Sequence, residues 1–307
     1  MRSSSPALLF SAALAISFAS AGSARTSYEP IEFRQVSGTR PFVHVAVNGK
    51  PFLFMVHANA SFYAMTTHAN AARAGIDNLV KKSAYGIESR GKVSELGRAD
   101  TTLKSLTVGT SSASDVPLTV FEAPQDPPME GMLGMKWLRD KRVIVDYDQG
   151  RVGLPESPDD GKTEDARLVS QGWVAHKMRW DAASGSYYVS GTVNGVATQF
   201  QVSTVGANTL DEGFARTAGI AFGPKVDEFA GPAGAVGNVF VAKRPLRVDI
   251  DMQHAAPIQP WIWNLDAYGS RKKPGGVQAT LGADFMLANV AVIDFGTETL
   301  LIKASAP

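Results

Sequence analysis

The sequence has no cysteine, and no block of basic residues interrupts it. Without cysteine, disulfides cannot stabilise the chain, so its 307 residues must hold together by burial of a core, for which they are numerous enough. The lack of a basic block disfavours nucleic acid and anionic membranes as main partners. A hydrophobic content of 44% with 19% charged residues is typical of a globular protein.

Acidic residues are also missing before Glu29. In this stretch Arg2 is followed by the apolar run "ALLFSAALAISFA" and by small residues, which is the layout of a secretory signal peptide. We expect residues 1–24 to be a signal peptide, cleaved after Ala21 or Ala24; an uncleaved anchor is the alternative. No second apolar run is long enough to span a membrane. We therefore expect a monomeric protein in the periplasm or outside the cell.

The sequence contains one pattern twice. Residues 42–57 read "FVHVAVNGKPFLFMVH" and residues 188–203 read "YVSGTVNGVATQFQVS". Each is an alternating strand, an Asn-Gly turn and a second alternating strand, which predicts a β-hairpin because both central turn residues need a positive φ. A short helical stretch ending in glycine follows each hairpin, at Gly75 and at Gly219.

A further block recurs later in each half. "GMLGMKWLRDKRVIVDYDQGRVGL" at 131–154 matches "ATLGADFMLANVAVIDFGTETLLI" at 279–302. Three blocks in one order, at offsets of about 146–148 residues, indicate two similar lobes. We expect an N-terminal lobe at 28–154, a polar linker at 155–167 and a C-terminal lobe at 168–307. The linker is acidic, contains Pro and Gly, and shows no apolar face.

These blocks resemble the lobes of aspartic peptidases, most closely the bacterial retropepsin-like families, here fused as in pepsin-type enzymes. The resemblance covers residues 40–303 and rests on the strand, turn, helix, "Leu-Gly" and "V-D-Y/F" blocks in this order. It implies an all-β fold of two pseudo-symmetric β-barrel lobes with short helices, and a cleft between the lobes as the binding site. We expect no cofactor and no metal.

The family places Asp-Thr-Gly at the turn after each hairpin, so that two carboxyl groups share a proton and activate water. The corresponding residues here are His57-Ala58-Asn59 in the first lobe. In the second lobe they are Ser203-Thr204-Val205, or Thr204-Val205-Gly206 in a shifted alignment. Neither lobe supplies an aspartate. Because loss of a general acid–base group costs about 10²–10⁴ in rate, we expect a pseudo-peptidase that binds a peptide, protein or glycan.

Other functions stay open at this point. A hydrolase could pair His57 as base with a hydroxyl such as Ser203, and a residual aspartic endopeptidase is a weaker alternative. A glycosidase would need two carboxyl groups about 5–9 Å apart, for which the candidates are Glu88, Glu95, Asp227, Glu228 and Asp266. His44, His57 and His68 match no established metal-ligand spacing.

Aromatic residues complete the list of candidate binding residues. Tyr85 lies in the segment where a flap hairpin would close over the cleft. Trp261 and Trp263 lie in a predicted loop at 257–269 that has no counterpart in the first lobe. Aromatic side chains offer a large contact area at low entropic cost, so with Asn59 these three residues are our ligand-binding candidates.

Overall fold

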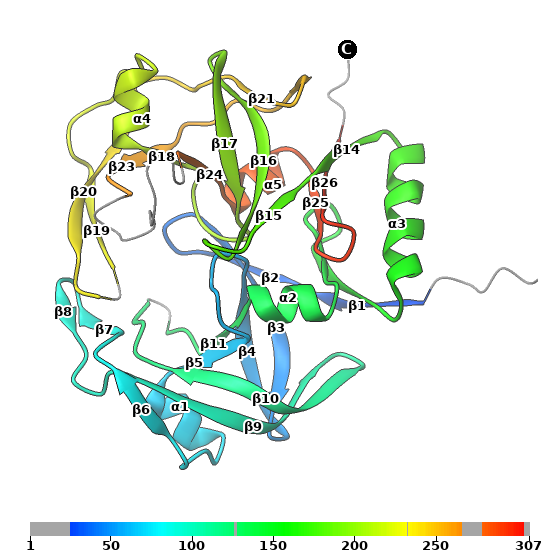
Figure 1. The fold of residues 1–307 in the computed structure, drawn as a ribbon, viewed down its shortest axis with the longest axis vertical. Helices are drawn as coiled ribbons and strands as arrows, with labels where there is room; N and C mark the ends of the chain where they lie inside the picture. Colours follow the sequence, from blue (N-terminus) through cyan, green and yellow to red (C-terminus); the bar gives the residue numbers. More distant parts are fainter. Residues whose placement is uncertain (1–24, 126–127, 232, 266–277, 304–307) are drawn as a thin grey trace, which may run out of the picture.

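The fold was determined as a computed structural model, which describes residues 25–125, 128–231, 233–265 and 278–303 (Figure 1). The predicted signal peptide lies outside the described residues. Two strand-rich lobes are joined by a shared sheet, so the predicted two-lobed all-β fold is confirmed. In the described part of the chain, no helix has both the length and the apolar character needed to cross a bilayer.

The N-terminal lobe is built on a sheet with the strand order β2-β3-β4-β11-β5-β10-β9-β6, in which β3 also pairs with β9. Its strands are β2 (Glu32–Gln35), β3 (Thr39–Val47), β4 (Lys50–His57), β5 (Ala64–Thr66), β6 (Val80–Ser83), β9 (Arg98–Val108), β10 (Ser111–Val120) and β11 (Gly131–Gly134). A separate hairpin pairs β7 (Ile87–Ser89) with β8 (Lys92–Val93). Two short helices belong to this lobe, α1 (His68–Arg73) and α2 (Met135–Asp140).

The C-terminal lobe repeats this plan in the order β19-β20-β23-β18-β24-β17-β16-β21-β22, with β15 paired to β16. Its strands are β15 (Arg179–Asp181), β16 (Ser186–Val193), β17 (Val196–Val202), β18 (Thr209–Asp211), β19 (Asp227–Ala230), β20 (Val236–Val241), β21 (Val248–Ile250), β22 (Gln253–His254), β23 (Trp261–Trp263) and β24 (Ala279–Leu281). Its short helices are α4 (Glu212–Thr217) and α5 (Ala283–Ala288).

A third sheet holds the lobes together. Its order is β1-β13-β12-β25-β26-β14, with the first three strands from the first half of the chain and the last three from the second. These strands are β1 (Thr26–Pro30), β12 (Ile144–Asp146), β13 (Arg151–Pro155), β14 (Trp173–Lys177), β25 (Val292–Asp294) and β26 (Thr299–Lys303). Buried residues of both lobes form one continuous apolar core with this sheet. The chain therefore folds as one body despite its internal repeat.

The two predicted hairpins form around their Asn-Gly turns. Asn48 and Gly49 have φ values of 49° and 77°, and Asn194 and Gly195 have 51° and 84°. These positive angles are those of the turn that fits the twist of a tight hairpin. Because the turn fixes the strand register, it also fixes which residues end β4 and β17.

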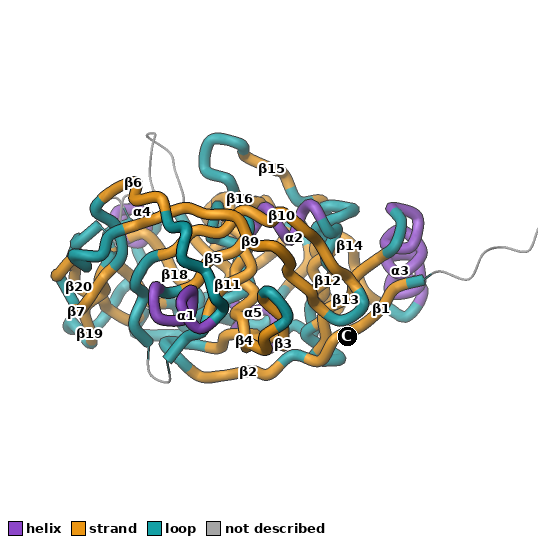
Figure 2. The backbone as a smooth tube through the Cα atoms, turned by 90° about the horizontal axis from the view of Figure 1, so that it is seen from below, coloured by secondary structure: helices purple, strands orange, loops and turns teal. Residues whose placement is uncertain are grey.

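The segment predicted as a polar linker, residues 155–167, is mostly helical. Helix α3 spans Pro158–Ser170 and buries Leu168, with Pro158 in its first turn. The Asp160 carboxylate accepts a hydrogen bond from the backbone N–H of Ser157 at 2.8 Å, which closes the start of the helix. Helix α3 stands at one end of the molecule, and the β7 and β19–β20 hairpins stand at the other (Figure 2).

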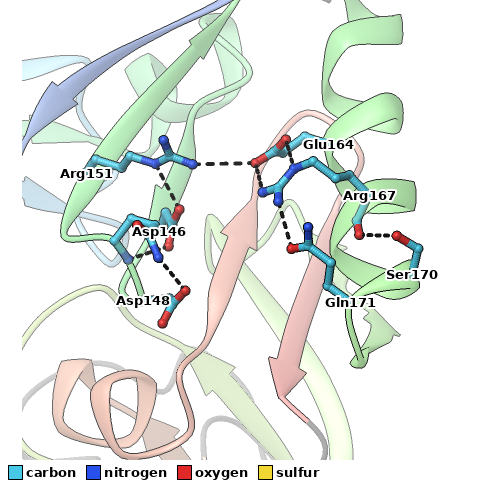
Figure 3. Close-up of polar contacts among 8 residues, drawn as sticks. Asp146, Asp148, Arg151, Glu164, Arg167, Ser170 and Gln171 are labelled. Atoms are coloured by element: carbon cyan, nitrogen blue, oxygen red, sulfur yellow. Dashed lines mark hydrogen bonds and ion pairs between the residues drawn. The ribbon is translucent and has the colours of Figure 1, made fainter.

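An alternating ladder of charges docks α3 on the shared sheet (Figure 3). Arg151 of β13 binds Asp146 at 3.0 Å and reaches Glu164 of α3 at 3.7 Å. Glu164 also accepts two hydrogen bonds from Arg167, which in turn donates to Gln171. These side chains line a cavity of about 480 Å³. Each of them forms an ion pair or a hydrogen bond with a charged or polar neighbour. We therefore assign the cavity a structural role in holding the helix.

The predicted loop at 257–269 is corrected by the structure. Residues Trp261–Trp263 form β23, which pairs parallel with β18 and antiparallel with β20. Ile262 is fully buried between its two partly exposed tryptophan neighbours. The pattern was missed because both pairing strands lie far away in sequence. Residues 266–269 of this segment lie outside the described residues.

Candidate functional site

The ends of β4 and β17 meet at the junction of the lobes, as the pseudo-symmetry predicted. The Thr204 hydroxyl accepts a hydrogen bond from the Ala58 backbone N–H at 2.8 Å and donates one to the Val56 carbonyl at 2.7 Å. Thr204 is completely buried. One side chain of the second lobe therefore holds the backbone on both sides of His57 in the first.

Further hydrogen bonds fix this junction. The Tyr147 hydroxyl donates to the Thr204 carbonyl at 2.8 Å, and the Gly206 N–H donates to the Thr39 carbonyl at 2.7 Å. The Thr39 N–H donates to the Asp284 carboxylate at 2.9 Å. Because these groups come from distant strands and helices, their positions are set by the whole fold.

Strand register decides which residues of the two turns are spatially equivalent. In the N-terminal lobe β4 runs parallel to β11, with His57 opposite Gly134. In the C-terminal lobe β17 runs parallel to β24, with Val202 opposite Leu281, so the next residue, Ser203, falls opposite Gly282. His57 and Ser203 thus hold matching positions, and Thr204 matches Ala58. This favours the first of the two alignments considered from the sequence.

The His57 ring is a neutral hydrogen-bond donor. Burial first, and then the positive charge of Arg40, lower the pKa of His57 to about 3. The Asn59 backbone N–H points to Nδ1 at 3.3 Å, so Nδ1 acts as the acceptor and the proton is assigned to Nε2. Part of the residue stays accessible to solvent although protein surrounds most of the ring. The group at this position therefore offers an N–H and no negative charge.

Arg40 is a site residue that the sequence reasoning missed. It lies on β3, and its guanidinium donates to the Met55 sulfur of β4 at 3.6 Å, so its charge acts on His57 at the end of the same strand. Its Nε donates to the Val36 carbonyl at 2.6 Å. The Asn-Gly turn at 48–49 was the available signal, because Arg40 and His57 lie at equal distances along the sequence on either side of it.

The Ser203 hydroxyl is engaged within its own turn. Its Oγ donates to the Val205 carbonyl at 3.1 Å and accepts from the Val205 N–H at 3.2 Å. The side chain is almost fully buried. The described geometry thus directs this hydroxyl away from the role of a nucleophile activated by His57.

The remaining binding candidates in the first lobe line the same region. The Asn59 amide oxygen is buried and has no hydrogen-bond partner among the described residues. Tyr85 packs edge-on against Phe121 with ring centroids 5.0 Å apart, and burial raises its pKa. Both rings belong to an apolar cluster that Val205 also touches. This cluster of aromatic and methionine side chains, called the wall below, extends to Val205 and so to the turn that contains Thr204.

The two tryptophans belong to the packing of the second lobe. Trp263 packs edge-on against Phe229 at 4.5 Å and joins a small cluster with Tyr188 and Leu265. Trp261 lies opposite Thr209 in the β18–β23 pair. The structure therefore gives Trp263 a packing role within its own lobe.

Several of the other candidate acids and histidines form ion pairs with charged side chains. Glu88 binds Lys92 at 2.9 Å, and both Asp227 and Glu228 bind Arg90. His68 lies 3.0 Å from Glu122. Glu95 lies on the surface, and Asp266 is outside the described residues. Within the described ranges, no three histidine or acidic side chains converge on a common point.

Comparison with known proteins agrees with this architecture. A family model described as a gag-polyprotein putative aspartyl protease matches residues 43–140, and no curated protein sequence matches. The aspartic proteinase from Irpex lacteus is 11% identical and has a TM-score of 0.50, with 92% of this chain and 98% of that chain covered. The chain has a retropepsin- and pepsin-like aspartic-peptidase fold. The predicted resemblance is confirmed.

Two further solved structures are similar. Conglutin gamma, a basic 7S globulin from lupine seeds, is 10% identical with a TM-score of 0.50, and 92% of this chain and 96% of that chain are covered. A retropepsin-like aspartic protease from Rickettsia conorii is 23% identical with a TM-score of 0.32, and 43% of this chain and 93% of that chain are covered. At a TM-score of 0.50, the fold is thus matched by one protein named a proteinase and by one named a globulin.

Proposed function

We propose that this aspartic-peptidase-like protein binds an extended peptide or similar ligand between its lobes and does not cleave it. The observation that carries the proposal is the chemistry at the two matched turn positions. A peptidase of this fold needs two carboxyl groups there, one to take a proton from water and one to donate to the scissile carbonyl. His57 presents an N–H instead, and the Ser203 hydroxyl is held by Val205.

The same groups indicate what kind of ligand group fits. A neutral imidazole that donates from Nε2, beside the positive charge of Arg40, favours a hydrogen-bond acceptor such as a peptide carbonyl or a carboxylate. A pair of aspartates would repel a carboxylate at this position. The neighbouring wall of Tyr85, Phe121 and Val205 suits an apolar side chain. A peptide with an apolar residue and a free carboxylate therefore fits best, ahead of a glycan.

Fold alone does not argue against this proposal, because one scaffold hosts many functions. One of the solved structures described above with a TM-score of 0.50 is named a globulin and not a proteinase. We further propose that the protein is exported to the periplasm or the medium. This part rests on the N-terminal apolar segment of the sequence, and fractionation of cells expressing the full chain tests it directly.

The test is a mass-spectrometric screen of the purified protein with peptides prepared both as free acids and as C-terminal amides, from pH 3 to 8. We expect retention without new products, at least tenfold stronger for the free acids, and unchanged from pH 4.5 to 8 because His57 stays neutral there. His57→Ala should lower retention, and His44→Ala, an exposed histidine on β3, should not. Products that disappear in His57→Ala would establish a hydrolase instead.

A further inference from the structure

Two hairpins, one from each lobe, meet at the end of the molecule opposite α3 (Figures 1 and 2). The first is β7–β8, with Arg90 and Gly91 in its turn, and it lies between β6 and β9 in the chain. The second is β19–β20. In each lobe, the hairpin comes before a strand that pairs parallel with the short strand after the His57 or Ser203 turn. In the first lobe β10 pairs with β5, and in the second β23 pairs with β18. They occupy matching places in the two lobes.

The hairpins touch through charged and apolar groups. The Arg90 guanidinium lies 3.3 Å from the Asp227 carboxylate and 3.6 Å from the Glu228 carboxylate. A Cβ placed on Gly91 would lie 3.2 Å from the nearest methyl of Val236, and one on Gly234 would lie 3.1 Å from a methyl of Val93. The backbone of each glycine therefore lies against a valine side chain of the other hairpin, beside an ion pair that joins the lobes.

The first hairpin is also connected to the floor of the junction. Tyr85, two residues before β7, packs on Phe121, and both belong to the apolar cluster that includes Val205. Val205 follows Thr204, the residue that holds the backbone around His57. Movement of the first hairpin would therefore change the wall beside the proposed ligand position.

We propose that Arg90, held by Asp227 and Glu228, latches the two hairpins together and controls ligand entry between the lobes. This inference rests on the proposed binding function and adds its regulation. About half of the Arg90 side chain is exposed, so solvent and salt screen these ion pairs. Such a latch holds weakly enough to open readily, and high ionic strength opens it further.

The charges around the latch define how it can be altered. Lys225 also binds Glu228, and the Asp227 carboxylate accepts the Glu228 N–H at 2.7 Å. On the first hairpin Lys92 binds Glu88 at 2.9 Å. Arg90 is thus the group of the first hairpin that is bound to acids of the second. Arg90→Glu reverses the interaction, and adding Asp227→Arg restores an opposite pair.

The first experiment measures the distance between the hairpins without any ligand. Because the chain has no cysteine, spin labels can be placed at Lys92→Cys and Asn238→Cys alone. We expect a short, narrow distance distribution that lengthens and broadens in Arg90→Glu or in 1 M salt, and that returns in Arg90→Glu with Asp227→Arg. Lys82→Glu, an exposed charge change on β6, is the control. An unchanged distribution in Arg90→Glu overturns the latch.

The second experiment locks the hairpins. In Gly91→Cys with Val236→Cys the side chains start close enough for a disulfide. Gly91 has a φ of 75°, so the cysteine is strained in both redox states and the reduced form is the control. With the free-acid peptides, we expect oxidation to slow association at least tenfold and reduction to restore it. Equal rates in both states overturn the gating role. If no peptide is retained by the wild type while the spin-label distances respond as expected, the proposed function fails and the latch stands.

Discussion

The two lobes share a scaffold and differ at the turn where they meet. Each lobe has an Asn-Gly hairpin whose second strand runs parallel to a "Leu-Gly" strand, with His57 opposite Gly134 and Ser203 opposite Gly282. At the turns themselves, Thr204 supplies a hydroxyl that holds the first lobe, while Ala58 in the matching position has none to return. The two lobes thus share the backbone geometry of this turn. Their side chains differ at three adjacent positions, which are residues 57–59 in the first lobe and 203–205 in the second.

A second contrast involves the matched aspartates at the ends of β12 and β25. Asp146 binds Arg151 at 3.0 Å and accepts the Gln149 N–H. Asp294 accepts two backbone N–H groups, but its other oxygen has no hydrogen-bond partner in the described ranges and faces Gly161 of α3. Asp165 of the same helix lies near it. One lobe therefore neutralises its aspartate with a cation, and the other places a second acid beside it.

The largest expected effect tests whether the repeated backbone is needed in both lobes. A Cβ at Gly134 would overlap the Phe62 carbonyl, and one at Gly282 would overlap the Gly206 carbonyl. We expect Gly134→Ala and Gly282→Ala each to lower the free energy of unfolding by about 3 kcal/mol or more, measured with urea. Gly223→Ala, where the built Cβ is 3.8 Å from its nearest neighbour, should change little. A large loss of unfolding free energy in only one of these two variants would show that the two lobes do not both need a glycine at this position.

The next effect tests the one-sided contact between the turns. Thr204→Val keeps the shape of the side chain and leaves the Ala58 N–H and the Val56 carbonyl without their partner. Each buried unsatisfied group costs about 1–3 kcal/mol, so we expect a loss of about 2–4 kcal/mol in unfolding free energy. The matched control is Thr102→Val, at an exposed position of β9. A loss below about 0.5 kcal/mol would show that the hydroxyl does not hold the lobes.

A third prediction restores the acid in one turn. His57→Asp replaces a neutral donor by a carboxylate beside the ligand. Above about pH 5 we expect at least tenfold weaker retention of free-acid peptides, equivalent to about 1.4 kcal/mol, and a smaller change for the amides. Retention of the free acids should recover as the new carboxyl group is protonated. Calorimetric titration at pH 4 and pH 7 compares the partly protonated with the ionised carboxyl group, and equal affinities for acids and amides would contradict the assignment of the donor.

The smallest effect concerns the second pair of acids. Burial first, and then the charges of Asp294 and Glu164, raise the pKa of Asp165 to about 7, although Thr297 donates to it at 2.6 Å. Burial also raises the pKa of Asp294. Because the folded pKa lies above the unfolded value of about 3.9, the folded protein binds more protons between about pH 4 and pH 7. Stability should therefore fall as pH rises through that window.

Asp165→Asn removes this pH dependence. After allowance for partial exposure of the carboxyl group, we expect the variant to gain about 1 kcal/mol at pH 8 and nothing below pH 4. Asp159→Asn, a highly exposed acid in the first turn of the same helix, is the control. Urea titrations from pH 4 to pH 8 measure the difference. Parallel curves for the wild type and Asp165→Asn would show that Asp165 ionises normally.

Much of the fold could be predicted because its signals are local. Alternating apolar residues, the two Asn-Gly turns and the repeated "Leu-Gly" blocks each depend on a few adjacent residues. β23 could not be predicted, because the strands that pair with it lie elsewhere in the sequence. Helix α3 was missed because few of its residues are apolar, although Ser157, Pro158 and Asp160 form a start signal.

The candidate site was predictable in position and not in detail. The sequence located both turns and indicated that they meet. It left the second register open, because "STVG" aligns in two ways, and the strand register together with the hydrogen bonds of Thr204 distinguishes them. The neutral state of His57 depends on burial and on Arg40, which are properties of the assembled fold. Arg90 was missed for the same reason, since its partners lie in the other lobe.

Helix α3 has a consequence for how strong the junction between the lobes must be. Two separate lobes would meet by diffusion, and their association would depend on protein concentration. A covalent connection of 13 helical residues keeps each lobe at a high effective concentration near the other, so a modest interface suffices at any dilution. Such a junction tolerates the loss of one hydroxyl at Ala58. It also allows the two hairpins to carry different side chains, so that Arg90 of one faces Asp227 and Glu228 of the other.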